Sequence, residues 1–200
     1  NNTALGFFAL NQNTTGDKNV AIGATALDAN TTGTNNTALG YKVLTAATTA
    51  NNNTGLGYGA LEGNTTASNN TAVGHFALSL NTTGTTNVAV GGVSLDANTT
   101  ASNNTAVGYD SLGANTTGTP NTAIGAYALR DNTTGSHNTA VGYVSGENIT
   151  TGTKNTSMGT HSLDVCTTGS FNTAIGQDAL GNASTGSGNT ACGQNALASV

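Results

Sequence analysis

The feature that most constrains this chain is a phrase that returns every 17 residues from one end of the sequence to the other. Glycine falls at the same place in twelve successive copies, at Gly6, Gly23, Gly40 and onward to Gly193, without an insertion or deletion. Repetition at a fixed period is the signature of stacked architectures and has to be explained before any single motif. Residues 1–200 therefore form one repeat array, whose copies start at Asn2, Asn19, Asn36 and so on.

Numbered from its asparagine, a copy typically has Asn at position 1, Thr or Val at 2, Ala at 3, Val, Ile or Leu at 4, and Gly at 5. Ala or Ser follows at 8, Leu at 9, Asn-Thr-Thr at 12–14, Gly or Ala at 15, and Thr or Ser at 16. One copy is too short to bury its own core, so neighbouring copies must cover its apolar residues. Abundant threonine and short apolar runs between turn-forming residues leave no room for a helix. The sequence predicts an all-β fold, a parallel β-solenoid or β-roll of about twelve 17-residue coils.

The alternation in each copy indicates which residues face the interior. Positions 2 and 4 point the same way along a strand, and position 2 is Val20 or Val88 in two copies, so we expect this face to be buried. The leucine at position 9, replaced only by Gly146, supplies the opposite half of the core. We therefore expect two short strands that face each other across a thin interior, in a rod roughly 55 Å long at a coil spacing of about 4.8 Å.

The invariant asparagine and glycine both have structural interpretations. Stacked asparagine amides can hydrogen-bond from one coil to the next as a ladder. The invariant glycine indicates a turn or a close backbone approach that a Cβ would prevent. The ladder asparagines are Asn2, Asn19, Asn36, Asn53, Asn70, Asn87, Asn104, Asn121, Asn138, Asn155, Asn172 and Asn189.

Composition narrows the function classes. The net charge is −5 with only four Lys plus Arg, which argues against a partner that is bound through its phosphates, such as DNA or RNA. No apolar stretch approaches the length of a membrane span, and without an initiator methionine the chain reads as a mature or excerpted segment of a longer fibre. Cys166 and Cys192 occupy different repeat positions, and we expect Cys192 to be a buried free thiol.

The NTT phrase matches the acceptor pattern for N-linked glycans. Where the usual asparagine is replaced, by Ile149 and by Ala183, an asparagine one residue earlier restores an acceptor triplet, which favours modification. Bare structural turns are the alternative, and the threonines could equally carry O-linked sugar. The candidate acceptors are Asn13, Asn30, Asn64, Asn81, Asn98, Asn115 and Asn132 in NTT, Asn1, Asn35, Asn52, Asn69 and Asn103 in NNT, Asn148 in NIT and Asn182 in NAS.

Other constellations do not converge on a site. His75, His137 and His161 occupy three different repeat positions, so stacking does not align them as metal ligands or beside a serine. The acidic residues at position 10 lie mostly two coils apart, which is too far for two carboxyl groups to share a proton. We predict no catalytic residues, no metal and no cofactor. The aromatic residues at position 6 could stack on sugar rings or on neighbouring coils, and we favour the latter. These position-6 residues are Phe7, Tyr41, Tyr58, His75, Tyr109 and Tyr143.

The phrases NTAVGYDSL, NTAIGAYAL and NTAIGQDAL resemble the head repeats of trimeric autotransporter adhesins. They are also similar to the NTAxGxxAL and NTTG arrays of phage tail fibres and bacterial surface fibres. The resemblance covers all 200 residues and implies a parallel β-roll, left-handed in the adhesins, without catalytic residues.

We expect a non-enzymatic structural protein that forms an extracellular or cell-surface filament or stalk decorated with glycan. Its partners would be further copies of itself and carbohydrate, attached or bound. The alternative is the shaft of a phage tail fibre or trimeric adhesin, which predicts a virion or surface trimer with apolar interfaces. A minor alternative is an ice-binding solenoid, which the threonines at position 2 permit but the valines there disfavour if that face is buried.

Overall fold

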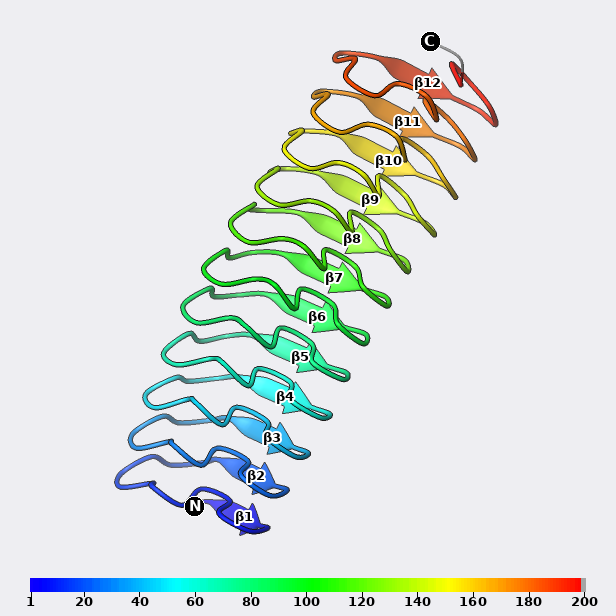
Figure 1. Ribbon diagram of the computed structural model, residues 1–200. Coiled ribbons are helices and arrows are strands. Elements are labelled where there is room, and N and C mark those ends of the chain that lie inside the picture. The colour runs from blue at the N-terminus through cyan, green and yellow to red at the C-terminus, as the bar shows by residue number, and fades with distance from the viewer. Residues whose placement is uncertain (199–200) are drawn as a thin grey trace.

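The computed structural model describes residues 1–198 and is a rod of stacked coils, with strands and turns but no helix in that range (Figure 1). Each coil contributes one three-residue strand at positions 2–4 of its repeat. The strands are β1 (Thr3–Leu5), β2 (Val20–Ile22), β3 (Thr37–Leu39), β4 (Thr54–Leu56), β5 (Thr71–Val73), β6 (Val88–Val90), β7 (Thr105–Val107), β8 (Thr122–Ile124), β9 (Thr139–Val141), β10 (Thr156–Met158), β11 (Thr173–Ile175) and β12 (Thr190–Cys192).

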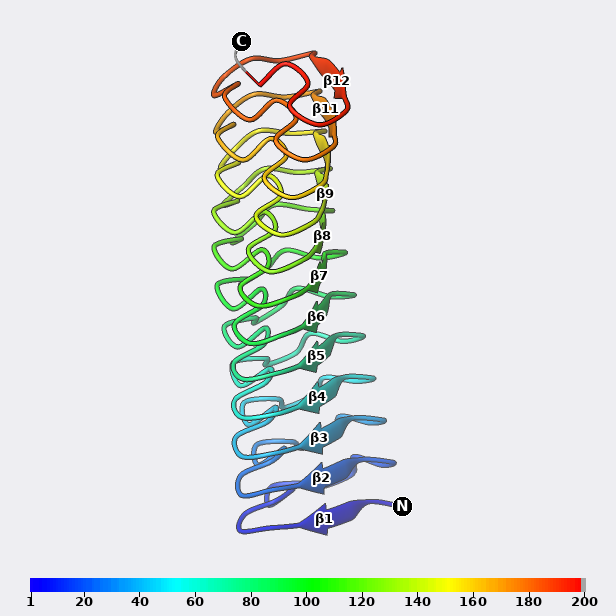
Figure 2. The ribbon, with the colours of Figure 1, turned by 90° about the vertical axis from the view of Figure 1, so that its right-hand side faces the viewer.

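The strands form one parallel sheet of 12 strands in chain order. The register never slips, because every strand pairs with the residues one repeat later, as Thr3 with Val20 and Thr156 with Thr173. The sheet follows one side of the rod while the turns close the other sides, and β1 and β12 lie at opposite ends (Figure 2). The predicted β-solenoid with one coil per 17-residue repeat is confirmed.

The strand faces differ from the prediction. Position 3 points inward, and its alanines, such as Ala21 and Ala106, are fully buried, whereas positions 2 and 4 face outward. A strand with period 2 can bury either set, and the narrow interior accommodates a methyl group more readily than a larger side chain. The outward orientation also keeps the threonine hydroxyls in water instead of burying them.

The second predicted strand does not form. From Leu27 to Leu180 the leucines at position 9 are buried, as expected, but they lie in a turn with left-handed backbone, for example at φ 51° in Leu27 and φ 55° in Leu61. A left-handed non-glycine residue costs about 1–2 kcal/mol, which is comparable to what burial of a leucine side chain contributes. Burial of leucine thus offsets the strain of the tight turn.

The invariant glycine confirms the predicted close approach of backbones. Gly40 has φ +134°, and a Cβ there would lie 2.0 Å from the carbonyl oxygen of Gly57 in the next coil. Gly108 has φ +137° and would place its Cβ 2.5 Å from backbone atoms of Gly125. Both the dihedral angle and the lack of space require glycine at position 5.

Where a core residue departs from the consensus, a neighbouring residue compensates in volume. Val43 replaces the usual small residue at position 8, and Gly55 replaces Ala in the adjacent strand, where a Cβ would lie 2.4 Å from Val43 Cγ1. In another coil Gly146 replaces leucine, and Ile149 replaces asparagine. A Cβ at Gly146 would lie 3.1 Å from Ile149 Cδ1, so the isoleucine side chain occupies space next to the missing leucine.

The first compensated pair gives a test. We expect Gly55→Ala to lower the free energy of unfolding by about 1–3 kcal/mol, because its Cβ overlaps Val43. Gly55→Ala combined with Val43→Ala should recover most of that loss, as measured by urea unfolding followed by circular dichroism. Gly108→Ala is the control that no side-chain change should rescue, since its obstacle is backbone. Equal midpoints for the single and double variants would contradict the packing argument.

Candidate functional site

The invariant asparagine at position 1 joins three parts of the rod. The Asn36 backbone N–H donates to Asn19 Oδ1 at 2.9 Å, and Asn36 Nδ2 donates at 2.7 Å to the carbonyl of Ala50, near the end of its own coil. Asn36 Oδ1 in turn accepts from the Asn53 backbone N–H at 3.0 Å. The same backbone-to-amide bond repeats at every step from Asn2 to Asn189. The predicted ladder is confirmed, with backbone groups as its main partners.

The asparagines of the NTT phrase form a second ladder. Asn81 Nδ2 donates to Asn64 Oδ1 of the preceding coil and to the Gly84 carbonyl, both at 2.9 Å. These side chains are fully buried at Asn30, Asn64, Asn81, Asn98, Asn115 and Asn132. An N-linked glycan is bonded to Nδ2, the atom that makes these hydrogen bonds. Their burial therefore contradicts N-glycosylation of these six asparagines in the folded coil.

The second ladder is interrupted where another residue replaces asparagine. Asn30 Oδ1 and Asn132 Oδ1 are buried without a hydrogen-bond partner, and the next residues in the column are Ala47 and Ile149. Neither residue carries the amide that would donate to these oxygens. Cys166 takes the same position in a later coil, where its thiol contacts the Gly169 carbonyl and burial raises the pKa of the thiol.

The remaining acceptor candidates other than Asn1 also have structural roles. Asn35, Asn52, Asn69 and Asn103 at position 17 are exposed and have left-handed φ of 58–64°, a conformation in which asparagine is enriched. Asn148 Nδ2 donates to the carbonyl of Asp164, and Asn182 Nδ2 donates to the carbonyl of Ala198. The shifted asparagines thus have a hydrogen-bonding role besides the acceptor triplet. Asn1 is exposed, and Asn13 is half-buried with Nδ2 donating to the Gly16 carbonyl.

The two threonines of NTT have different environments. At position 13, Thr31 Oγ1 donates to the Thr48 carbonyl at 3.1 Å, and equivalent bonds recur along the rod. At position 14, the threonine is exposed, and its side chain forms no hydrogen bond with another described residue. Both threonines recur in the repeat, and nothing in the sequence distinguishes their environments.

The outer sheet face combines a threonine column with an apolar column. Leu39, Ile124 and Met158 at position 4 are each 42 % exposed, and Val88 at position 2 is 36 % exposed. Cys192 also lies in this outward column and is exposed, which corrects the expected burial of its thiol. An ice-binding face was disfavoured only if position 2 is buried. Because position 2 faces outward, this objection does not hold, and the ice-binding alternative stays a prediction.

Aromatic residues collect along one edge at positions 6 and 7. Tyr41 and Tyr58 rings lie 5.3 Å apart, and Tyr58 stacks on His75 at 5.4 Å. A second group contains Tyr109, Tyr127 and Tyr143. Packing between neighbouring coils, as expected, is therefore present, although the tyrosines at position 6 are about half exposed.

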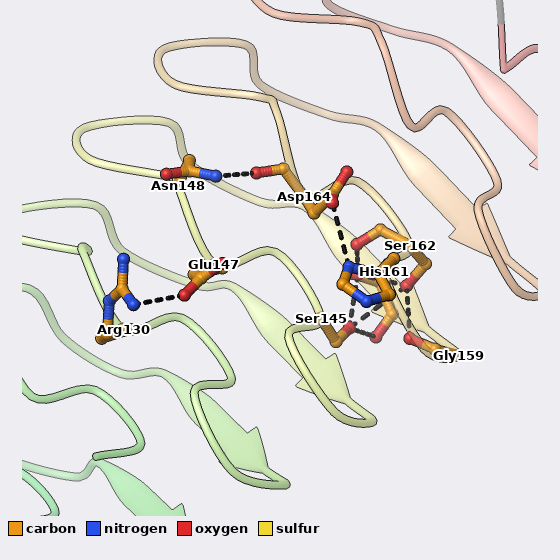
Figure 3. Close-up of polar contacts among 9 residues, drawn as sticks. Arg130, Ser145, Glu147, Asn148, Gly159, His161, Ser162 and Asp164 are labelled. Atoms are coloured by element: carbon orange, nitrogen blue, oxygen red, sulfur yellow. Dashed lines mark hydrogen bonds and ion pairs between the residues drawn. The ribbon is translucent and has the colours of Figure 1, made fainter.

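Ionisable side chains form two close pairs that Figure 3 draws. Arg130 contacts Glu147 across adjacent coils, and His161 Nδ1 lies 3.2 Å from Asp164 Oδ2. The three histidines are not brought together. No group of three or more His, Cys, Asp or Glu side chains among the described residues could hold a metal ion.

Three serines meet in the interior, and Figure 3 labels two of them, Ser145 and Ser162. Ser157 Oγ lies 2.6 Å from both Ser145 Oγ and Ser162 Oγ, and all three side chains are buried. Ser157 replaces the usual alanine of the strand, and its hydroxyl also donates to the backbone carbonyl of Ser162 at 2.7 Å. This burial makes the serines a satisfied polar cluster of the core and closes them to a substrate.

Two aspartates on the surface are partly desolvated. Burial raises the pKa of Asp96 above its ordinary 3.8, with a further contribution from the charge of Asp110. Burial likewise raises the pKa of Asp110, while Arg130 opposes the shift. Their ionised forms are therefore less favourable in the fold than in the unfolded chain.

Comparisons with known proteins found no family model, curated protein or solved structure that matches this chain. Residues 1–198 include no helix of the length and hydropathy needed to span a membrane.

The interrupted ladder predicts a stabilising substitution. Ala47→Asn would supply a donor to the unpaired Asn30 Oδ1 and an acceptor to Asn64 Nδ2, joining two separate ladder segments. We expect the free energy of unfolding to rise by about 1 kcal/mol, read as a higher urea midpoint. Ala47→Asp has a similar size but no N–H donor and should destabilise the rod. If both substitutions lower the midpoint equally, the missing amide is not what limits this coil.

The raised aspartate pKa predicts a pH dependence. The penalty for ionised Asp96 is fully present above its folded-state pKa and disappears as the pH falls below the ordinary 3.8. Asp96→Asn should therefore raise the melting temperature at pH 7, and this gain should shrink steadily on acidification toward pH ~4. Asp17→Asn is the control, because the Asp17 side chain is 42 % exposed and its pKa is lowered, chiefly by its contact with the amino terminus. A gain for Asp96→Asn that does not change with pH would contradict the desolvation argument.

Proposed function

We propose that the array is a non-enzymatic structural segment of an extracellular fibre or stalk whose surface carries glycan. The observation that carries this proposal is the uninterrupted position-1 ladder, which couples each coil to the next alongside a continuous 12-stranded sheet. Most backbone hydrogen bonds run between neighbouring coils, along the length of the rod. A protein built in this way resists extension and bending and presents a repeated surface.

The surface composition supports an extracellular location. The exposed turns carry mainly Thr, Asn and Ser, and only four Lys plus Arg offer cleavage sites to trypsin-like proteases. The acidic balance of the chain is consistent with partners other than nucleic acid. We propose further copies of the chain and carbohydrate as its partners, with no cofactor.

The outer sheet face supports a second candidate, the shaft of a phage tail fibre or trimeric adhesin. Its apolar column is exposed at Leu39, Ile124 and Met158, and no strand residue on this face is charged. A neutral apolar stripe along a rod suits side-by-side association with identical rods, because burial of this area would be favourable.

One experiment distinguishes the two candidates. Electron microscopy of the native assembly should show rods, with one chain in cross-section for a single-chain filament and three for the shaft. Light scattering on Ile124→Lys adds a test in solution: a side-by-side trimer should dissociate, and a single-chain rod should keep its mass. His137→Lys is the matched control, because His137 is exposed in the same coil as Ile124 and lysine occurs at its repeat position in Lys18 and Lys154. Compact particles without elongation would overturn both candidates.

A further inference from the structure

The threonine at position 14 is invariant although it lies on the surface. It is exposed in all eleven copies that reach position 14, whereas exposed position 17 ranges over Lys, Asn, Thr, Pro, His, Phe and Gly. The members of this row are Thr15, Thr32, Thr49, Thr66, Thr83, Thr100, Thr117, Thr134, Thr151, Thr168 and Thr185. The fold tolerates variation at other exposed positions, so surface location alone does not explain why this residue is fixed.

Hydrogen bonding does not explain the invariance either. The neighbouring threonine at position 13 is held by its hydroxyl, as Thr116 Oγ1 donates to the Thr133 carbonyl at 3.1 Å. Thr117 participates through its backbone N–H, which donates to the same carbonyl at 3.3 Å and which any residue except proline could supply. Among the described residues, no partner binds the hydroxyl of a position-14 threonine. The free hydroxyl is therefore the feature of threonine that remains to explain why position 14 does not vary.

The asparagine amide, the other candidate for glycan attachment in the NTTG turn, is buried. The position-12 asparagine, Asn115 in this coil, is fully buried, and its Nδ2 donates to Asn98 Oδ1 and to the Gly118 carbonyl. Gly118 at position 15 is also buried. Each typical NTTG turn thus presents one exposed hydroxyl that is free to react, and such groups recur about every 4.8 Å along the rod.

We infer that the position-14 threonines are O-glycosylation sites and that they carry the glycan coat of the fibre. This inference rests on the proposed function and specifies its linkage. The threonine Oγ1 attacks the anomeric carbon of a sugar activated as a glycosyl phosphate donor, under the action of a glycosyltransferase. The new C–O bond replaces the bond from the anomeric carbon to the phosphate leaving group, and the hydroxyl proton passes to a base of the transferase.

The test is site mapping on the native protein. Because Lys and Arg are scarce, peptides are produced with pepsin and sequenced by electron-transfer dissociation mass spectrometry, which keeps sugars attached. We expect glycan masses on Thr117 and its equivalents, and none on Thr116 and its equivalents. Alkaline β-elimination should release the glycan, since it is bonded to threonine oxygen.

Variants expressed in the native host provide the matched control. Thr117→Val keeps the shape of the side chain and should remove one site's glycan mass, whereas Thr116→Val should remove none. Glycan found only on position-13 threonines or on exposed asparagines such as Asn35 would overturn this inference and leave a glycan-coated fibre standing. A native chain without any glycan would overturn both this inference and the coat, while the rods seen by microscopy would still decide the fibre proposal separately.

Discussion

The structure depends on the position-1 asparagine, whose side chain hydrogen-bonds to backbone N–H and C=O groups that the short strands do not pair. A three-residue strand supplies few sheet hydrogen bonds, and most of each coil is turn. Asn104 is typical: its amide donates to the Gly118 carbonyl of its own coil, and its oxygen accepts from the Asn121 backbone N–H of the next. The side chain therefore closes one coil and sets the position of the following one. Its full burial makes these hydrogen bonds stronger and makes their loss expensive.

The same requirement explains why the repeat tolerates no insertion. An extra residue in one coil would displace the asparagine from both of its partners and move the glycine backbone contacts, which leave no space for a Cβ. Substitution is tolerated more readily than insertion because volume can be exchanged locally. Val43 with Gly55, and Gly146 with Ile149, show that one change in the core is matched by another across the same interior.

Much of the fold could be predicted from the sequence because it follows from the period. The coil length, the parallel stacking, the asparagine ladder and the glycine contact all depend on residues that recur at one position. The inward face could not be derived in the same way, because alternation is symmetric and two valines at position 2 favoured the wrong set. The decisive quantity was the width of the interior, which admits only small residues at position 3: alanine in most coils, Gly55 and Ser157 in two. The leucine turn was missed because its left-handed backbone carries no glycine signal.

The glycan question shows why recurrence alone does not identify a surface site. Positions 12, 13 and 14 recur almost equally, and an acceptor pattern draws attention to the asparagine. In the folded coil the three residues have different environments. The asparagine is buried and hydrogen-bonds to the neighbouring asparagines, the hydroxyl of the first threonine donates to a backbone carbonyl, and the second threonine faces water. A residue that is invariant and structurally engaged is explained by the fold. A residue that is invariant, exposed and unengaged needs a reason outside the fold, and in this rod the position-14 hydroxyl meets that description.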